Sequence, residues 1–340
     1  MKAAVVEGYR KIAVRDIEEP KPDGKKVLIK VSKCGICGSD YHYYFDHGDS
    51  LKGWVLGHEY SGIVEDPGDR TDLKAGDPVV IFGCRGCMKC ELCLNGMTHL
   101  CRELGLSHGG YGEYALRDPD LVVKLPEEVS LVEAAMLEPL ANAVHAVRKA
   151  GVYNCAKVLV IGGGIIGTTS LVMARNAGAT YTGLVEINMA RAEKSLERGE
   201  CDAIFDAKDP ELQAKQLQAN GGKGYDFVFE CSGTGAGMNT AIDSVHPGGT
   251  IVLVGTNTEP AMINLGPLVL KEVKLQSSYG YLREDFFHAV ELAQRKKIDL
   301  SQFASFVKLD DVPQAFNDLI EGKIRDTKLV IDVDGSICGN

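Results

Sequence analysis

KVLVIGGGIIG, residues 157–167, is the stretch of sequence that decides the fold. Its first half is apolar enough for a buried strand, and a helical pattern follows directly. Between the two, Gly162, Gly164 and Gly167 fill the glycine positions of a G-x-G-x-x-G motif. Only glycine lets the backbone turn sharply and approach a pyrophosphate there, while the first amides of the helix bind the phosphate oxygens. The motif alone is a weak signal, but its place between strand and helix predicts a nucleotide site that includes Ile165 and Ile166.

Apolar strands recur after this stretch, at TGLVEI, YDFVFE and TIVLVG, with helical segments between them. Strands that alternate with helices predict a parallel sheet covered by helices on both faces. The expected fold class is therefore α/β, with a doubly wound Rossmann sheet over residues 154–280.

Glu186 ends the second of these strands, nineteen residues after Gly167. A carboxylate at this place accepts hydrogen bonds from both hydroxyls of the adenosine ribose and repels a 2′-phosphate. Because the next residue is Ile187 and not an arginine, the sequence favours NAD over NADP. Arg191 is a candidate for covering the adenine, with a solvated surface arginine as the alternative. The alternative for the whole motif is a glycine-rich turn that packs the helix on the strand and binds no nucleotide.

The first 150 residues or so consist of short β-rich runs punctuated by Gly, Pro and Asp, which predict an irregular β-rich domain. Helices near 284–296 and 312–321 and a strand near 327–333 are expected to rejoin that domain. A chain of 340 residues is also about twice the usual domain length. We therefore assign 1–153 and 281–340 to one domain and 154–280 to the nucleotide-binding domain.

Four closely spaced cysteines, Cys87, Cys90, Cys93 and Cys101, lie in the β-rich part. Two residues between successive thiols let one short loop wrap a tetrahedral metal ion, so the spacing predicts a structural zinc site. Cys84 is a fifth candidate, although a closed tetrahedral site holds only four ligands. A redox-active loop is the alternative.

A second set of potential ligands is scattered: Cys37 in GICGSDYH, His58 and Glu59 in GHEYSG, and Glu138 in LEPLANAVH. One thiolate, one imidazole and carboxylates form a mixed ligand set with room for an exchangeable water, as in catalytic zinc sites. Neighbouring residues on a regular strand face opposite sides, so His58 and Glu59 reach one ion only if the backbone bends. Spacing leaves open whether the four converge. Cys37 also forms a C-x-x-C pair with Cys34, which a redox motif would use.

Composition limits the partners. The net charge of −10 and the pI near 5.4 disfavour nucleic acid and anionic membranes, because phosphate binding needs clustered Lys and Arg. No run approaches the roughly 20 apolar residues of a membrane span, and the start resembles no secretion signal, so we expect a cytoplasmic protein. Its eleven cysteines are then expected as thiols and metal ligands, since the cytosol keeps thiols reduced.

Together, GICGSD, GHE, the cysteine quartet, the EP dipeptide and GGGIIG resemble the zinc-dependent medium-chain dehydrogenase/reductases, in this order and over nearly the whole chain. Glu138 followed by Pro139 is similar to the polyol and diol dehydrogenases of that superfamily, the sorbitol, butanediol and threonine group, rather than to the ethanol-type enzymes. Met88 departs from the family, which usually has Gly there. The resemblance implies that the β-rich part is a GroES-like catalytic domain carrying a zinc lobe.

Carried onto this chain, the resemblance implies one catalytic and one structural zinc per subunit. Cys37 and His58 would hold the catalytic ion, with Glu59 or Glu138 nearby and the two glutamates exchanging with water. The cysteine quartet beginning at Cys87 would hold the structural ion.

The resemblance also implies roles around the substrate. Ser39 matches the hydroxyl that hydrogen-bonds the substrate oxygen, His42 matches the residue that passes the proton to solvent through the cofactor ribose, and Asp40 would orient a metal ligand. The expected reaction is hydride transfer from a secondary hydroxyl of a small polyol, diol or hydroxy amino acid to NAD, with the alkoxide stabilised by zinc. The family suggests a homodimer or homotetramer.

The substrate itself is not fixed by the sequence. Phe45, Trp54 and residues 277–285 are candidates to line its pocket, and Arg283 is a candidate to hold a carboxylate or phosphate. Alternatives are an enzyme for a phosphorylated or acidic sugar alcohol, a zinc-free quinone or enoyl reductase of the same fold, and a non-catalytic NAD-binding protein.

Overall fold

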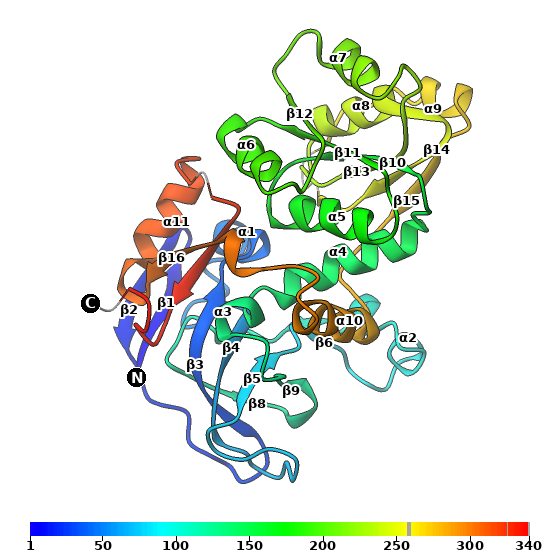
Figure 1. The fold of residues 1–340 in the computed structure, drawn as a ribbon. Coiled ribbons are helices and arrows are strands. Elements are labelled where there is room, and N and C mark those ends of the chain that lie inside the picture. The colour runs from blue at the N-terminus through cyan, green and yellow to red at the C-terminus, as the bar shows by residue number, and fades with distance from the viewer. Residues whose placement is uncertain (257–259, 325, 339–340) are drawn as a thin grey trace. The chain divides into compact units, whose positions relative to one another are not determined.

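The structure, a computed structural model, describes residues 1–256, 260–324 and 326–338, without the side chains of residues 42, 43, 45 and 46. Its contacts divide the chain into two units: unit 1 is Met1–Glu138 with Leu282–Asn340, and unit 2 is Pro139–Tyr281 (Figure 1). The sequence-based boundary falls after residue 153, whereas the structure places it near the start of helix α4 (Leu137–Ala150). Because α4 is one continuous helix that begins in unit 1 and runs into unit 2, no change of composition marks that boundary.

Unit 2 is built on a six-stranded parallel sheet in the order β12-β11-β10-β13-β14-β15. Its strands are β10 (Lys157–Ile161), β11 (Tyr181–Glu186), β12 (Ala203–Asp206), β13 (Tyr225–Glu230), β14 (Val245–Leu253) and β15 (Lys274–Ser277). Its further helices are α5 (Ile165–Asn176), α6 (Met189–Glu197), α7 (Leu212–Ala219), α8 (Gly235–Ser244) and α9 (Gly266–Leu270). Figure 1 shows α5 on one side of this sheet and α7 and α8 on the other. The predicted Rossmann sheet is confirmed, and its strand order reverses between β10 and β13, where sheets of this kind bind ligands.

The apolar residues of these strands explain why the sheet forms. Val158, Leu159 and Val160 of β10 are fully buried, as expected for a central parallel strand covered on both faces. Leu159 belongs to a core that also includes Val185 of β11 and Val228 of β13. Helix α5 therefore starts from a rigid strand end, and this places the glycine loop.

Unit 1 is built on a seven-stranded sheet in the order β16-β17-β3-β4-β5-β9, with β8 paired to β3. Its strands are β1 (Lys2–Gly8), β2 (Lys11–Asp16), β3 (Val27–Gly35), β4 (Glu59–Asp66), β5 (Pro78–Ile81), β6 (Cys84–Arg85), β7 (Gly105–Leu106), β8 (Tyr114–Arg117), β9 (Val122–Lys124), β16 (Ala304–Lys308) and β17 (Lys328–Asp332). Its α-helices are α1 (Gly38–Asp46), α2 (Glu91–Leu94), α3 (Leu131–Ala134), α10 (Arg283–Gln294) and α11 (Val312–Ile320), with short 3-10 turns at Thr98–Leu100, Pro119–Leu121, Ser301–Phe303 and Leu309–Asp311. The strand from the C-terminal part, β17, pairs with β3 from the N-terminal part, so the two segments form one sheet as predicted.

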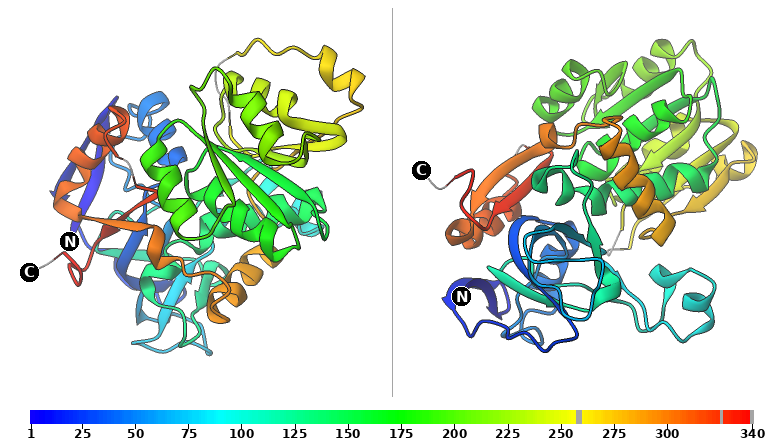
Figure 2. Two further views of the ribbon diagram at one scale, coloured as in Figure 1. Left: turned by 45° about the horizontal axis from the view of Figure 1, so that its top comes forward. Right: turned by 60° about the horizontal axis from the view of Figure 1, so that its bottom comes forward.

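A small lobe around α2 projects from unit 1 (Figure 2). It contains the two-stranded pairing of β6 with β7 and the cysteine-rich loop. Such a lobe has little apolar core of its own, which is the situation in which a structural metal contributes to folding.

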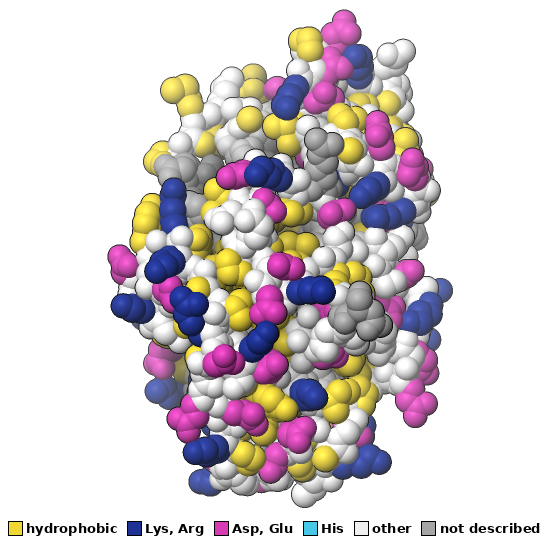
Figure 3. Space-filling view, turned by 90° about the vertical axis from the view of Figure 1, so that its left-hand side faces the viewer, with side chains coloured by type: hydrophobic (Ala, Val, Ile, Leu, Met, Phe, Trp, Pro, Cys, Tyr) yellow, Lys and Arg dark blue, Asp and Glu magenta, His cyan; other side chains and the backbone are white. Residues whose placement is uncertain are grey.

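Two features bear on possible partners. On the face drawn in Figure 3, Lys and Arg side chains are interspersed with Asp and Glu. Within the described residues, no helix combines the length and the apolar character needed to cross a bilayer.

Candidate active site

The glycine loop of unit 2 has the backbone geometry that the motif predicts. Gly162 has φ +97°, in the region that favours glycine, and Gly164 precedes the first residue of α5. A Cβ on Gly167 would overlap the carbonyl oxygen of Gly162, so α5 approaches the loop this closely only with glycine there. A Cβ on Gly164 would meet nothing, which leaves the space beside the helix N-terminus open for a phosphate.

Glu186 lies at the end of β11, beside this loop, and is only 4% exposed. Its Oε2 accepts a hydrogen bond from the Gly163 amide, and its Oε1 accepts bonds from the amides of Ile187 and Asn188 at 2.8 Å. Arg191 Nη1 lies 3.6 Å from Oε2. In this structure the carboxylate therefore fixes the loop. Oε1 already accepts two hydrogen bonds, so Oε2 is the oxygen that keeps a lone pair for a ribose hydroxyl.

In unit 1 the structure brings together three of the four scattered ligand candidates. Cys37, His58 and Glu59 each offer a ligand atom, and these atoms lie within 4.8 Å of one another. His58 is outside the strand, because β4 begins at Glu59 and Gly57 before it has φ +87°. The required bend is therefore present, and the two neighbours do not face opposite sides as they would within a regular strand.

Pairing between strands places Glu59 in this group. Glu59 at the start of β4 is the register partner of Gly35 at the end of β3. A Cβ on Gly35 would overlap Glu59 Oε2, so the glycine leaves room for the carboxylate. Cys37 follows two residues later, just before α1.

Asp40 lies behind His58 and is fully buried. Its Oδ1 is 3.4 Å from His58 Nδ1, while its Oδ2 accepts bonds from the Cys37 amide at 3.1 Å and from the Tyr111 hydroxyl at 2.7 Å. Burial alone would raise the pKa of Asp40, but His58 outweighs it and lowers that pKa to about 2. A charged carboxylate on Nδ1 leaves His58 Nε2 as the metal-binding nitrogen, the usual carboxylate–histidine arrangement.

Glu59 also contacts a residue that the sequence did not single out. Its Oε2 forms an ion pair with Lys328 Nζ, and Lys328 donates a second bond to the Ile36 carbonyl at 2.9 Å. Burial alone would lower the pKa of Lys328, but Glu59 and Cys37 outweigh it and raise that pKa. The only signal in the sequence is a lysine directly before three apolar residues at the start of the strand KLVID.

The remaining predicted residues differ in how they relate to this group. Glu138 is buried in the first turn of α4, outside the group of three, and is close enough to Lys328 to raise its pKa. Ser39 is in α1, and its Oγ is buried without a hydrogen-bond partner among the described residues. The side chains of His42 and Phe45 lie outside the described part of the chain.

The donor set fits a zinc ion. A thiol, an imidazole nitrogen and a carboxylate oxygen converge. Ser39, two residues after Cys37, adds a buried hydroxyl without a hydrogen-bond partner among the described residues. The three candidate ligands, Cys37, His58 and Glu59, are thus present together with Asp40, the carboxylate behind the histidine.

The cysteine quartet also converges, within the same 4.8 Å limit. The Sγ atoms of Cys87 and Cys93 are 3.9 Å apart, as are those of Cys90 and Cys101. Tetrahedral zinc with four sulfur ligands would place them about 3.8 Å apart. Backbone amides of Lys89 and Cys90 lower the pKa of Cys87, which favours the thiolate that a metal needs. Cys84 is in β6, outside this group.

Met88 has φ +56°, which explains why glycine suits this position of the loop. The loop nevertheless closes, at a backbone cost of about 1–2 kcal/mol.

Arg283, a candidate to hold an anionic group of the substrate, is engaged within unit 1. It donates a hydrogen bond to the Asp120 carbonyl at 2.9 Å and stacks over the rings of Phe82 and Phe287.

Comparisons with known proteins agree with this geometry. Family models match residues 23–127 as an alcohol dehydrogenase GroES-like domain and residues 166–295 as a zinc-binding dehydrogenase. D-xylulose reductase A from Aspergillus oryzae is 32% identical over 336 residues, covering 94% of this chain and 93% of the relative. L-idonate 5-dehydrogenase from Vitis vinifera is 30% identical, covering 94% and 92%. The crystal structure of 2R,3R-butanediol dehydrogenase from Bacillus subtilis has a TM-score of 0.86 and 30% identity, covering 98% of this chain and 99% of that one. The chain therefore belongs to the zinc-dependent medium-chain dehydrogenase/reductases, in their polyol dehydrogenase group, and is an oxidoreductase.

Proposed function

We propose that this enzyme oxidises a secondary hydroxyl of a small polyol, diol or hydroxy amino acid, with NAD as the hydride acceptor. The observation that carries the proposal is the convergence of Cys37, His58 and Glu59, with the buried Ser39 hydroxyl two residues after Cys37 in the chain. The relatives named for xylulose, idonate and butanediol support a substrate with neighbouring hydroxyl groups.

In this proposal the zinc, when bound by Cys37, His58 and Glu59, supplies a positive charge that lowers the pKa of the substrate hydroxyl toward neutrality. Ser39 Oγ would accept the proton of that hydroxyl while it passes its own proton on toward His42, which would release it to solvent, as in the family. Asp40 holds His58 with Nε2 directed to the ion. Lys328 holds one oxygen of Glu59 and thereby positions the carboxylate.

The NAD assignment is supported by Glu186 with Ile187 after it. A buried carboxylate beside the glycine loop repels the 2′-phosphate of NADP, and the exposed Ile187 offers no charge to compensate. Gly162, Gly164, Ile165, Ile166 and Gly167 would hold the pyrophosphate, and Arg191 would lie near the adenosine.

A panel of xylitol, sorbitol, 2R,3R-butanediol, L-idonate and threonine, scored by NADH absorbance with zinc-loaded protein, tests this function. Cys37→Ala should abolish turnover while calorimetry shows unchanged NAD binding, and Cys155→Ala, at an exposed cysteine, should behave as wild type. Full turnover by Cys37→Ala, or equal rates with NADP and NAD, would contradict the proposal.

We also propose that the enzyme is a homodimer or homotetramer in the cytoplasm. Exposed apolar residues gather around α9 and the sheet's outer strand β15: Met262, Leu265, Val269, Leu270 and Leu275. Such a patch is typical of an interface, and β15 has an unpaired edge among the described strands. Leu270→Asp should shift the sedimentation coefficient to that of a monomer, whereas an unchanged value would exclude this interface. The thiolate quartet needs a reducing compartment, which supports the location.

A further inference from the structure

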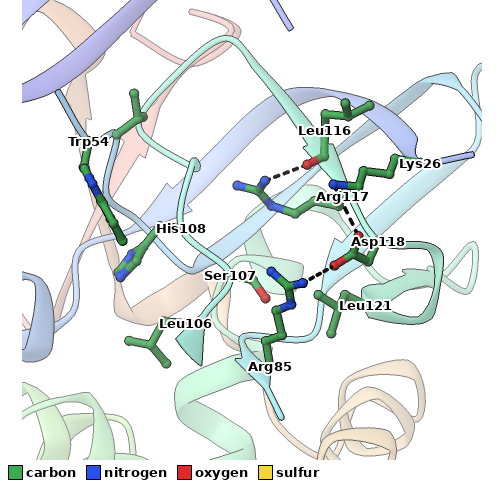
Figure 4. Close-up of a pocket in the computed structure, with 11 residues that line it drawn as sticks. Lys26, Trp54, Arg85, Leu106, Ser107, His108, Leu116, Arg117, Asp118 and Leu121 are labelled. Carbon is green, nitrogen blue, oxygen red and sulfur yellow. Dashed lines mark hydrogen bonds and ion pairs between the residues drawn. The ribbon is translucent and has the colours of Figure 1, made fainter. Parts of the chain in front are cut away.

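Unit 1 contains a pocket of about 420 Å³ (Figure 4), lined by Trp54, which the sequence offered as a candidate for the substrate pocket, and otherwise by residues outside the metal group. Its volume is within the range of about 300–1,000 Å³ that is typical of small-molecule sites. Trp54 and His108 lie on one side of it, and Lys26, Arg85, Arg117 and Asp118 lie on the other.

The charged side carries more positive than negative charge. Lys26 Nζ is 3.5 Å from Asp118 Oδ1, and Arg85 Nη2 is 3.2 Å from Asp118 Oδ2. Arg117 is a third cation in the lining, so three positive groups and one carboxylate line the pocket of a protein whose net charge is −10. Asp118 therefore neutralises only part of the charge that faces the pocket.

Arg117 is held in place before any ligand arrives. Its Nη1 donates to the Leu116 carbonyl at 2.7 Å, its Nε donates to the Tyr60 hydroxyl, and its guanidinium lies 5.7 Å from the Tyr60 ring centroid. Gly109 has φ +124°, and a Cβ there would overlap Arg117 Nη2. This terminal nitrogen has no hydrogen bond to any described residue, so the guanidinium is fixed with one edge left for a ligand.

The other side of the pocket is formed by two aromatic rings. Trp54 is 50% exposed, and its ring stands edge-on to His108 at 6.2 Å between centroids. The half-exposed indole on one side and the fixed guanidinium on the other offer one surface for an apolar body and one for a negative charge.

We propose that this pocket binds a small organic anion, whose carboxylate or phosphate lies among Lys26, Arg85 and Arg117 and whose apolar body lies against Trp54. The alternative is that the cations serve only to neutralise Asp118. The two hypotheses predict different results when Asp118 is replaced. In the first, Asp118 competes with the bound anion for Lys26 and Arg85, so its removal tightens anion binding. In the second, no anion binds with or without Asp118.

Binding can be measured without turnover, because Trp54 is the single tryptophan of the chain. We expect cyclohexanecarboxylate and cyclohexyl phosphate, added to the zinc-loaded full-length protein at low ionic strength, to change Trp54 fluorescence in a saturable way and to release or absorb heat in calorimetry. The probe that binds more tightly shows whether the pocket prefers a carboxylate or a phosphate. Cyclohexanecarboxamide, which has the same shape without charge, should not bind, and added salt should weaken the anions.

Three variants separate the alternatives. Arg85→Gln should weaken anion binding about tenfold, the loss expected for one charge-assisted hydrogen bond. Asp118→Asn should tighten it, and Lys297→Gln, at an exposed lysine elsewhere in unit 1, should leave it unchanged. Arg85 is 64% exposed and pairs only with Asp118 among the described residues, so its replacement should not disturb folding.

The proposal is overturned if neither anion produces heat or a fluorescence change, if the uncharged amide binds as tightly as the acid, or if Arg85→Gln binds like wild type. It would also be overturned if Asp118→Asn bound the anions more weakly. Failure of the dehydrogenase assay would leave these measurements unaffected, because they require neither NAD nor turnover.

Discussion

Replacing Lys328 by methionine tests how the metal group of unit 1 is held together. The Lys328 side chain is 3% exposed and that of Glu59 is 1% exposed, and the two form an ion pair. Methionine keeps the length and most of the volume of lysine but removes the charge. Removing one partner of a buried pair leaves the other charge uncompensated, at a cost of about 3–5 kcal/mol. We expect Lys328→Met to lower the free energy of unfolding of unit 1 by that amount.

The sign of the effect at neutral pH follows from the pKa of Lys328. Burial alone would lower this pKa, but Glu59 and Cys37 outweigh it and raise it above the usual 10.5. A group whose pKa is higher in the folded state contributes stability that is fully present below its unfolded pKa and is lost as the pH rises through the folded value. The pair therefore stabilises the protein over the whole neutral range.

Urea unfolding followed by Trp54 fluorescence is a suitable assay, because Trp54 is in unit 1 and is the single tryptophan. Lys323→Met is the matched control: it removes an ion pair with Glu321 in which the lysine is 61% exposed, and we expect no measurable loss. The loss for Lys328→Met should be smaller with zinc than with a chelator, because the ion supplies a second positive charge near Glu59. Equal midpoints for Lys328→Met and Lys323→Met in chelator would refute the reasoning.

Three further predictions follow from other sites. Gly167→Ala should destabilise unit 2 and abolish NAD binding in calorimetry, because the added Cβ overlaps the Gly162 carbonyl. The added Cβ of Gly164→Ala meets no protein atom, so this variant should keep the melting temperature of wild type and only lower the affinity for NAD. Burial raises the pKa of Glu200 from 4.5 to about 7, so the stability of the wild-type protein should fall as the pH rises through this range. Glu200→Gln should remove this pH dependence of the melting temperature. The variant should be about 1–3 kcal/mol more stable than wild type above pH 7. Cys93→Ser should release one equivalent of zinc per chain in elemental analysis while Cys84→Ser releases none; loss of metal from Cys84→Ser would contradict the quartet.

The features that the sequence predicts well are those encoded over short distances. Strand β10, the glycine loop and α5 are consecutive, so hydrophobic pattern and glycine spacing together specify them. The cysteines from Cys87 to Cys101 are likewise within one loop, and their spacing alone brings the sulfur atoms together. The first domain boundary is less well predicted, because α4 is continuous and carries no signal where one unit gives way to the other.

The metal group that includes Cys37 depends on pairing between distant strands, which spacing cannot show. Gly35 of β3 is paired on one side with Glu59 of β4 and on the other with Val330 of β17. Those two pairings bring the N-terminal and C-terminal segments to one point, and Lys328 reaches Glu59 only because β17 lies beside β3. Its role could not be predicted, since the register of a strand more than 260 residues away is not contained in any local pattern.

The same pairings bear on the choice between the two glutamates that the sequence left open as metal ligands. Glu59 is within the group of Cys37 and His58, and because Lys328 engages its Oε2, its Oε1 remains the oxygen to face an ion. Glu138 is outside that group, and its position has an independent physical reason: an acidic side chain in the first turn of α4 is favoured by the positive end of the helix dipole. Lys328 also forms its ion pair with Glu59 when no metal is bound, so the carboxylate is held in place before the ion arrives. We therefore infer that Glu59 is the third ligand and that this site is largely preformed in the metal-free protein.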